Sequence, residues 1–516
     1  MKKVCNSFLL VLATAFFAIG QTPLSQQDLD HARIYYDIDE ALQTPKKVYK
    51  LYLDFNDLED LPGTITKLEN LHELNLGGNP NINWPTAFEL LSKLTQLQKL
   101  NLSENEINLI PKQITKLAGL QDICLTGNAG MDWEKTFEAL SQLPNLKRLD
   151  LGNNEIKDLP SSVGQMKSLE RLYLWGNRLV NLPPEIGDAT NLVELDLSNN
   201  SLRRLTTKIG QLKSLRKLYL WSNQLTDLPE ELKKLKKLEQ LDLGGNNLTD
   251  IPALLKKLKS LRELGLPYNN LLRIPKELCK LKKLEKLDLE GNPNLNWYNL
   301  FEDAKAMSNL RVLNLINNGL IDLPPGVEEM QGLVELDLKQ NPYINWNNTF
   351  VQLAKIESLR KLNLSANSLK EVPKALMELT NLEELHLNQN STIVWADVFP
   401  TLAKLPNLRV LSLFNNQLEE LSPEIEQLKT LEELGLGKNK DLKWEATFDL
   451  LAKLPKLKKL SLISNDLEGL PENVAKLEKL QELYLWMNKF NLNSTQHKEI
   501  QELLPNTNII YMPRYF

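Results

Sequence analysis

The sequence is poor in the residues that most often carry catalysis or bind transition metals. Its 516 residues include three cysteines and four histidines. The histidines lie far apart in the chain, so we expect neither a metal site nor a catalytic triad among His31, His72, His386 and His497. No phosphate-binding G-x-x-x-x-G-K, zinc-protease H-E-x-x-H or redox C-x-x-C motif occurs. The sequence therefore predicts a protein with no enzymatic activity, no cofactor and no metal.

Charged residues are plentiful, but no stretch is rich in one sign. The formal net charge of −5 comes from 61 basic and 66 acidic residues that are mixed along the chain. Without a basic stripe, the sequence offers no surface for nucleic acid or anionic lipid. It also lacks Gly/Ser-rich linkers and low-complexity tracts, so we expect one continuous fold despite a length that would usually imply several domains.

A short apolar run stands at the start of the chain. Lys2 and Lys3 precede the apolar or small residues 8–20, and Ala18-Ile19-Gly20 fits a small-residue cleavage site. The run is too short to span a bilayer comfortably. We interpret residues 1–20 as a secretory signal peptide cleaved after Gly20; loss of the two lysines then takes the formal charge from −5 to −7. An uncleaved anchor is the alternative.

The chain is dominated by asparagines at nearly constant spacing. Nineteen of them are separated by twelve intervals of 23 residues and six of 26. Almost every one ends the pattern L-x-x-L-x-L-x-x-N. The L-x-L part alternates with period two, which places its leucines on one face of a short strand, and parallel strands stack about 4.8 Å apart. Each asparagine lies where the chain leaves its strand, and we expect its buried amide to satisfy backbone groups of the turn. These ladder asparagines are Asn56, Asn79, Asn105, Asn128, Asn154, Asn177, Asn200, Asn223, Asn246, Asn269, Asn292, Asn318, Asn341, Asn367, Asn390, Asn416, Asn439, Asn465 and Asn488.

This pattern resembles the leucine-rich repeat (LRR), which forms solenoids. The resemblance covers residues 48–490. It implies an α/β horseshoe with a concave parallel sheet of about 19 strands and a convex side of short helices and 3₁₀ turns. The 23-residue form has L-P-x-x-I-x-x-L in its outer half and is similar to the repeats of plant intracellular Ras-group LRR proteins and of many bacterial surface proteins. Long and short repeats alternate at both ends, whereas six short intervals run from Asn154 to Asn292.

The 26-residue repeats place a tryptophan, and four residues later a phenylalanine, on the outer side. Trp84 and Phe88 are the first such pair. Three extra residues can complete an α-helical turn, and the rings would fill the wider space that this helix leaves. The constant outer position favours core filling over ligand binding for these tryptophans.

Both ends of an open solenoid need a cap, because they expose core and an unpaired strand edge. We expect an N-terminal cap at residues 21–47, with an amphipathic helix within 28–47 that covers the first strand. We expect a C-terminal cap at 491–516, with a helix that begins at Ser494 and a final edge strand at 509–511.

The cysteine positions bear on the origin of the protein. Cys124 and Cys279 lie six strand spacings apart, roughly 30 Å, which is too far for a disulfide. Animal extracellular LRR proteins usually carry cysteine-rich caps, so their absence here favours a bacterial origin.

The concave face is where solenoids usually bind, and here it is predicted to carry tyrosine, tryptophan and aspartate in stripes. Tyrosine, tryptophan and arginine are enriched at binding hot spots. The alternative is that duplicated repeats copied the aromatic residues without selection for a ligand. The predicted ligand-binding residues are Asp150, Tyr173, Trp175, Asp196, Tyr219, Trp221, Asp242 and Tyr268, with Arg148, Arg171 and Lys217 beside them.

We therefore expect an exported bacterial LRR protein, secreted, periplasmic or on the cell surface, that is monomeric and binds a protein on its concave face. Nucleic acid is not an expected partner, and no membrane span remains after cleavage. Two alternatives stay open. Aromatic faces and carboxylates also suit carbohydrate or an envelope polymer, and an intracellular signalling scaffold would follow if residues 1–20 did not export the chain.

Overall fold

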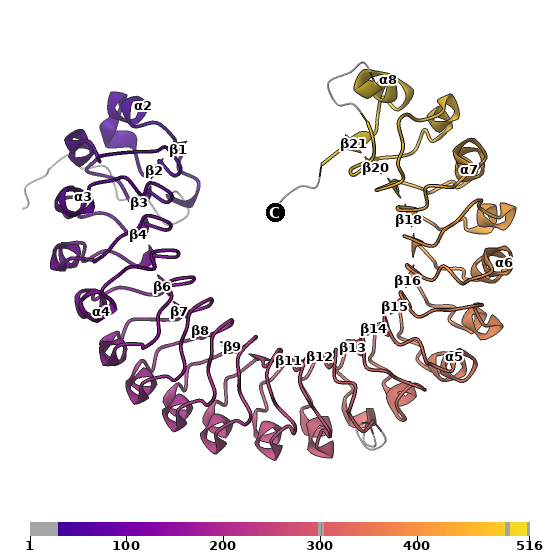
Figure 1. Ribbon diagram of the computed structural model, residues 1–516, viewed down its shortest axis with the longest axis horizontal. Helices are drawn as coiled ribbons and strands as arrows, with labels where there is room; N and C mark the ends of the chain where they lie inside the picture. Colours follow the sequence, from indigo (N-terminus) through magenta and orange to yellow (C-terminus); the bar gives the residue numbers. More distant parts are fainter. Residues whose placement is uncertain (1–28, 298–300, 302–303, 491–495, 513–516) are drawn as a thin grey trace, which may run out of the picture.

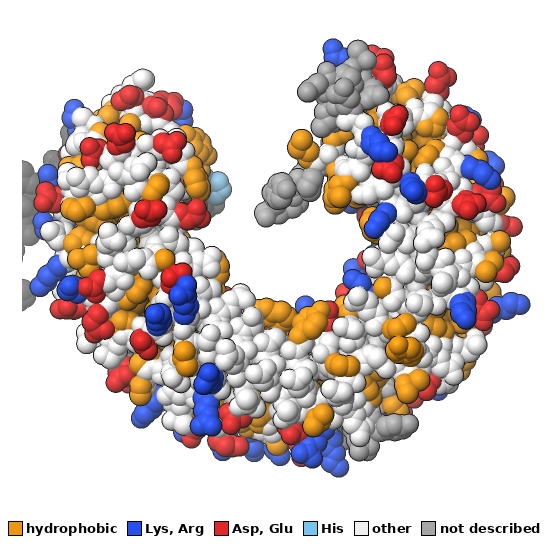
Figure 2. Space-filling model, viewed as in Figure 1, with side chains coloured by type: hydrophobic (Ala, Val, Ile, Leu, Met, Phe, Trp, Pro, Cys, Tyr) orange, Lys and Arg blue, Asp and Glu red, His pale blue; other side chains and the backbone are white. Residues whose placement is uncertain are grey.

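The computed structural model describes residues 29–297, 301, 304–490 and 496–512, which form an open horseshoe (Figure 1). Strands line the inner wall and short helices line the outer wall. The expected signal peptide and Ser494 lie outside the described residues. Figure 2 shows acidic and basic side chains intermixed over one side of the molecule, as the sequence indicated.

The inner wall is a single parallel sheet of 21 strands, which confirms the predicted fold class. Each strand pairs in register with the next one along the chain, so equivalent positions of successive repeats lie side by side. The strands are β1 (Ile34–Tyr35), β2 (Lys50–Tyr52), β3 (Glu73–Asn75), β4 (Lys99–Asn101), β5 (Asp122–Cys124), β6 (Arg148–Asp150), β7 (Arg171–Tyr173), β8 (Glu194–Asp196), β9 (Lys217–Tyr219), β10 (Gln240–Asp242), β11 (Glu263–Gly265), β12 (Lys286–Asp288), β13 (Val312–Asn314), β14 (Glu335–Asp337), β15 (Lys361–Asn363), β16 (Glu384–His386), β17 (Val410–Ser412), β18 (Glu433–Gly435), β19 (Lys459–Ser461), β20 (Glu482–Tyr484) and β21 (Asn508–Ile510).

The two strands beyond the expected nineteen belong to the ends. At the C-terminal end, α8 (Gln496–Leu503) precedes β21, and Ile500 is buried. At the N-terminal end a short helix lies within residues 28–47, as expected, but the residues before it form a strand that was not predicted. Asp37 caps α2 (Ile38–Gln43) by accepting a hydrogen bond from the Glu40 amide at 2.7 Å, so the preceding residues are free to form β1 and pair with β2.

The outer wall differs between the two repeat lengths. In most short repeats a proline precedes a five-residue 3₁₀ turn, because proline fixes φ and lacks an amide donor. These turns are η2 (Gly63–Lys67), η3 (Lys112–Lys116), η4 (Ser161–Gln165), η5 (Pro184–Asp188), η6 (Thr207–Gln211), η7 (Glu230–Lys234), η8 (Ala253–Lys257), η9 (Lys276–Lys280), η12 (Lys374–Glu378), η14 (Pro423–Gln427) and η15 (Glu472–Lys476); shorter ones are η1 (Pro45–Lys47), η10 (Ala304–Ala306), η11 (Val327–Glu329) and η13 (Trp395–Asp397).

Five of the six long repeats carry an α-helix in the same place, within the part of the chain that the structure describes. These helices are α3 (Trp84–Leu91), α4 (Trp133–Leu140), α5 (Trp346–Leu353), α6 (Val398–Leu402) and α7 (Trp444–Leu451). The phenylalanine of each long repeat is buried, and the tryptophan packs against the core. Trp84 is the most deeply buried of these tryptophans, and its indole N–H donates to the Asn105 carbonyl at 3.1 Å. The tryptophans therefore fill the outer core, as expected from their constant position.

Three glycines bring the 3₁₀ turns of the central repeats close together. A Cβ atom on Gly164, Gly187 or Gly210 would lie 2.6 Å from a backbone carbonyl oxygen of the next turn. These carbonyls belong to Glu185, Lys208 and Glu231. Only glycine allows this approach. The spacing between successive turns along the outer wall is consequently short from η4 to η7.

The asparagine side chains tie each repeat to the one before it. Asn246 donates to the carbonyls of Leu220, Leu243 and Gly244 at 2.9–3.0 Å, and it accepts a hydrogen bond from the Leu225 amide at 2.9 Å. Sixteen of the nineteen ladder asparagines are buried. Asn56 differs because it is exposed at the N-terminal end of the ladder, and its backbone amide donates to the side chain of Asn79.

We predict that Asn246→Ala lowers the free energy of unfolding by about 3–5 kcal/mol. Its removal leaves several buried backbone groups without their partner, at about 1–3 kcal/mol for each group that water cannot reach. The neighbouring exposed Asn247→Ala is the matched control, with a change within about 0.5 kcal/mol. Chemical denaturation followed by circular dichroism measures both. Equal effects of the two substitutions would contradict the ladder as a source of stability.

Candidate functional site

The predicted stripe of aspartate and tyrosine lies on adjacent strands of the concave face. From β6 to β12 the residues at the same register position are Asp150, Tyr173, Asp196, Tyr219, Asp242, Gly265 and Asp288, which we call the central stripe. Arg171 and Lys217 lie two positions earlier on their strands, on either side of Glu194. The structure thus brings the predicted residues together on one wall.

The aspartates of the central stripe also have a local role that the sequence analysis missed. Asp196 accepts a hydrogen bond from the backbone amide two residues later at 2.9 Å, and Asp242 does the same. Asn75 and Asn314 make the equivalent bond in other repeats, at 3.1 and 3.0 Å. The occurrence of both Asp and Asn at this position was the available signal, because their side-chain oxygens can hold the same turn.

Burial changes the acidity of these carboxyls. Desolvation raises the pKa of Asp196, Asp242 and Asp288 above the usual range, and the hydrogen bond from the turn amide opposes this rise. Burial and the nearby carboxylates of Glu194 and Glu263 likewise raise the pKa of Tyr219 to about 12. The stripe is therefore a partly desolvated, acceptor-rich surface on which the tyrosines stay protonated at neutral pH.

At one end of the predicted site the charged side chains already form ion pairs with one another. The Arg148 guanidinium lies 3.0 Å from Asp122 Oδ1 and 2.8 Å from Asp150 Oδ2. It also stacks over the ring of Tyr173, with its central carbon 4.9 Å from the ring centroid. Asp150 is buried. Arg148 and Asp150 are thus largely satisfied by each other and by their neighbours, so they offer a ligand less than the sequence implied.

The tryptophans lie at the carboxyl ends of the strands, each against a glycine of an adjacent repeat. A Cβ on Gly152 would lie 2.3 Å from the ring of Trp175, and one on Gly244 would lie 2.1 Å from the ring of Trp221. The Trp221 ring also meets Tyr268 edge to face, with centroids 6.0 Å apart and an interplanar angle of 85°. Both tryptophans are half-buried, so packing fixes their orientation while one part of each indole stays accessible.

Tyr268 is the most exposed aromatic side chain of the predicted site, at 48%. Its hydroxyl donates to the Glu290 carboxylate, and this bond, followed by burial, raises the pKa of Tyr268 to about 12. Figure 2 shows apolar side chains gathered at the inner rim over β11 and β12. The accessible aromatic surface is consequently concentrated around Trp221 and Tyr268.

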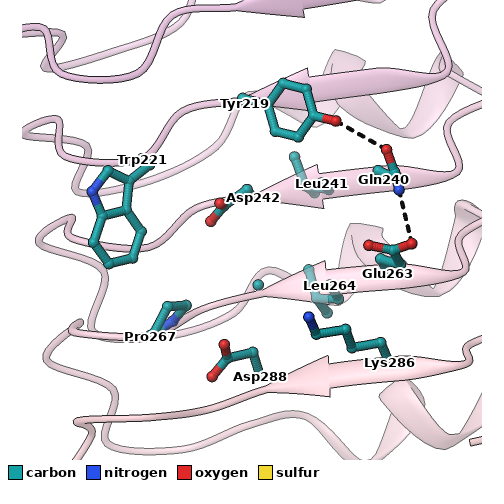
Figure 3. Close-up of a pocket in the computed structure, with 11 residues that line it drawn as sticks. Tyr219, Trp221, Gln240, Leu241, Asp242, Glu263, Leu264, Pro267, Lys286 and Asp288 are labelled. Atoms are coloured by element: carbon teal, nitrogen blue, oxygen red, sulfur yellow. Dashed lines mark hydrogen bonds between the residues drawn. The ribbon is translucent and has the colours of Figure 1, made fainter. Parts of the chain in front are cut away.

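A shallow depression of about 190 Å³ opens beside these rings. Figure 3 shows its lining, with Trp221 and Pro267 at one end, Gln240 and Glu263 toward the other, and Asp242 and Asp288 between them. Gly265 lies at its centre, in the register position that holds aspartate or tyrosine on the strands on both sides. Nothing in the sequence indicated a depression at this glycine.

Metal binding and thiol chemistry find no support in the described residues. Within the described ranges, no group of three or more His, Cys, Asp and Glu side chains is arranged to hold a metal ion. Burial raises the pKa of the Cys124 thiol, which disfavours the reactive thiolate. The described part of the chain contains no helix with the length and apolar character needed to cross a bilayer.

Comparison with known proteins identifies the repeat. A leucine-rich repeat region model matches residues 131–242, and two further leucine-rich repeat models match residues 213–272 and residues 96–117 and 407–428. No curated protein sequence matches the chain.

Solved structures extend the comparison to nearly the whole chain. An LRR protein of Leptospira interrogans is 31% identical over 93% of this chain and 100% of its own, with a TM-score of 0.55. TLR13, in a structure titled as its complex with ssRNA13, is 23% identical over 91% of this chain and 72% of its own, with a TM-score of 0.56. At that identity the second likeness concerns the fold alone.

We predict that Asp242→Asn keeps the fold and is at least as stable as the wild type at pH 7. Asparagine preserves the acceptor for the Gly244 amide and removes a charge that burial disfavours. Because the folded-state pKa of Asp242 is raised, ionisation penalises the fold above that pKa, and the penalty vanishes as the carboxyl is protonated at low pH. Any advantage of the asparagine should therefore shrink as the pH falls.

The companion substitution Asp242→Ala removes the same charge and also loses the turn hydrogen bond, so it should be about 1 kcal/mol less stable than Asp242→Asn at any pH. Denaturation midpoints measured from pH 7 to pH 3 distinguish the two roles of this side chain. A large destabilisation by Asp242→Asn at pH 7 would show that the negative charge itself supports the fold.

Proposed function

Because this chain belongs to the leucine-rich-repeat family, we propose that it is a non-enzymatic recognition protein that binds a protein partner on its concave face. The observation that carries this proposal is the row of fixed, partly accessible aromatic rings at the strand ends, formed by Trp175, Trp221 and Tyr268. Rigid aromatic residues lose little entropy when they bind, and they dominate the energetics of protein interfaces. A solenoid presents such residues on an extended concave wall.

The charged residues around the rings support the same function. Arg171 is exposed and Lys217 is half-buried on strands that flank Glu194, and the carboxylates of the central stripe lie beside them. Mixed charge next to aromatic rings favours a partner with its own pattern of donors and acceptors, because such patterns set specificity and association rate.

We further propose that the protein is bacterial and exported. Support comes from the signal-like residues 1–20, the lack of cysteine-rich caps, and the 31% identity to an LRR protein of Leptospira interrogans. In this proposal residues 21–47 and 491–516 cap a single solenoid of residues 48–490, and the mature protein acts as a monomer at the cell surface, in the periplasm or in the medium.

The binding surface is tested with the double variant Trp175→Ala/Trp221→Ala. The wild type and the double variant are each used as bait in the form of residues 21–516. The double variant should bind the partner that the wild type captures with an affinity at least tenfold lower, because truncation of a hot-spot tryptophan costs about 2 kcal/mol or more. The matched control is Tyr343→Ala, which removes an aromatic side chain that is 73% exposed outside the predicted patch. Isothermal titration with the purified partner measures the affinities.

Unchanged affinity of the tryptophan double variant would place recognition elsewhere on the molecule. If no protein is captured and a glycan array instead shows binding that depends on the two tryptophans, the carbohydrate alternative replaces the protein partner.

Export is tested by expression of the full chain in a bacterial host. We expect most of the protein outside the cytoplasm, with Gln21 as its first residue after cleavage at Gly20. A matched chain that lacks residues 8–20 should stay inside the cell. Full-length protein that remains cytoplasmic with residues 1–20 attached would favour the intracellular scaffold.

A further inference from the structure

The depression at Gly265 interrupts an otherwise continuous row of side chains. Asp242 and Asp288 occupy the same register position on the strands to either side, about 10 Å apart at two strand spacings. Glycine contributes no side chain between them, so the depression opens in the middle of the row. The depression therefore lies where a side chain is absent, with one carboxylate on the strand to each side.

The walls of the depression are held in place before any ligand arrives. The Tyr219 hydroxyl donates to Gln240 Oε1 at 3.0 Å, and the Gln240 amide donates to Glu263 Oε1 at 2.8 Å, as the dashed lines in Figure 3 show. Trp221 is fixed against Gly244 and Tyr268. A pre-ordered wall of this kind lowers the entropic cost of binding.

The charge of the lining favours a cation. Three carboxylates, those of Asp242, Glu263 and Asp288, face one ammonium group, that of Lys286. The backbone amides of Gly244 and Glu290 bind one oxygen each of Asp242 and Asp288, at 2.9 and 3.0 Å. An ionised carboxylate offers about four acceptor positions, so both retain capacity for a donor from outside. An anionic group would be repelled, and a purely apolar group would cover these acceptors without replacing their hydrogen bonds.

The size of the depression limits the ligand further. Sites for drug-sized molecules usually measure roughly 300–1,000 Å³, whereas this one measures about 190 Å³. A volume of this size suits one long side chain. The adjacent indole of Trp221 adds a face over which a planar cation can stack.

We propose that the Gly265 depression binds one arginine side chain of the partner protein, with the guanidinium between Asp242 and Asp288 and against Trp221. This inference rests on the proposed function, since it assigns a chemical feature to the partner of the concave face. Arginine is preferred to lysine because its planar fork donates to two carboxylates and stacks on an aromatic ring, whereas a lysine ammonium is a compact, strongly hydrated charge.

The test fills the depression with a side chain and shifts the Asp242 carboxylate beside it. Gly265→Asn places an amide on β11 at the register position that Asn314 occupies on β13, and the new Cβ would meet the carboxylate of Asp242 at 2.9 Å. The matched control is Gly435→Asn, at the same position of β18, where the new Cβ would meet the Ser412 hydroxyl at 3.0 Å. Both substitutions should leave the circular dichroism spectrum and the denaturation midpoint close to those of the wild type.

The probe is a displayed library of short random peptides selected on residues 21–516. The proposal expects the selected peptides to share an arginine whose replacement by citrulline, a neutral isostere, weakens binding at least tenfold. It also expects Gly265→Asn to weaken the arginine peptide by a similar factor and to leave the citrulline peptide nearly unaffected, with no change from Gly435→Asn.

Two results overturn the inference and leave the proposed function standing. One is selection of peptides that need Trp175 and Trp221 but contain no basic residue. The other is an arginine peptide that binds Gly265→Asn as tightly as the wild type. The proposed function fails on different results, namely capture of the partner that survives the loss of both tryptophans, or binding of glycans in place of any protein.

Discussion

The fold depends on the hydrogen bonds of the buried asparagines. A coil that leaves a parallel strand must turn through its own interior, where carbonyls and amides have no strand partner and no water. The Asn246 side chain meets this need with three donated bonds and one accepted bond, and one of the donated bonds reaches the preceding repeat. The same side chain therefore closes one turn and fixes its distance from the last. Leucine burial drives association of the coils, but the asparagine sets where each coil begins and ends.

This constraint explains why single residues can give the wall its function. Because every repeat enters the sheet in the same register, equivalent side chains lie side by side on the concave face. The surface therefore changes locally only where one residue differs from its equivalents on the neighbouring strands. Gly265 is one such exception, and Trp221 with Tyr268 is another. The framework is shared by the whole family, whereas the proposed binding chemistry lies in these departures.

The period of the sequence was sufficient to predict the parallel sheet, the convex turns and helices, and the place of each asparagine. All three follow from local rules that repeat, so errors in one repeat are corrected by the others. The N-terminal strand was missed because β1 forms on the edge that β2 leaves open, and this pairing has no repeated pattern. Asn56 was predicted as a buried ladder residue, but it is exposed at the end of the ladder.

The candidate site was predicted less completely, for reasons of three-dimensional contact. The pattern placed the aspartates on the concave face, but it could not show that their oxygens hold the turn amides. Arg148 appeared available in the sequence because the carboxylate of Asp122, which neutralises it, comes from the preceding repeat. The Gly265 depression could not be found from residue types at all, since it consists of an absent side chain between two present ones.

The glycines of the outer wall set the shape of the surface on the other side. Strands keep a spacing of about 4.8 Å, and helices pack about 8–10 Å apart, so the difference between the two walls bends the solenoid. Where Gly164, Gly187 and Gly210 let adjacent turns approach closely, that difference is small. A side chain at any of the three positions would push adjacent turns apart on the convex wall and would increase the curvature of the concave sheet. These three glycines lie on the convex wall, away from the proposed binding surface, and they still influence the curvature of the concave face and so the size of the partner that fits inside it.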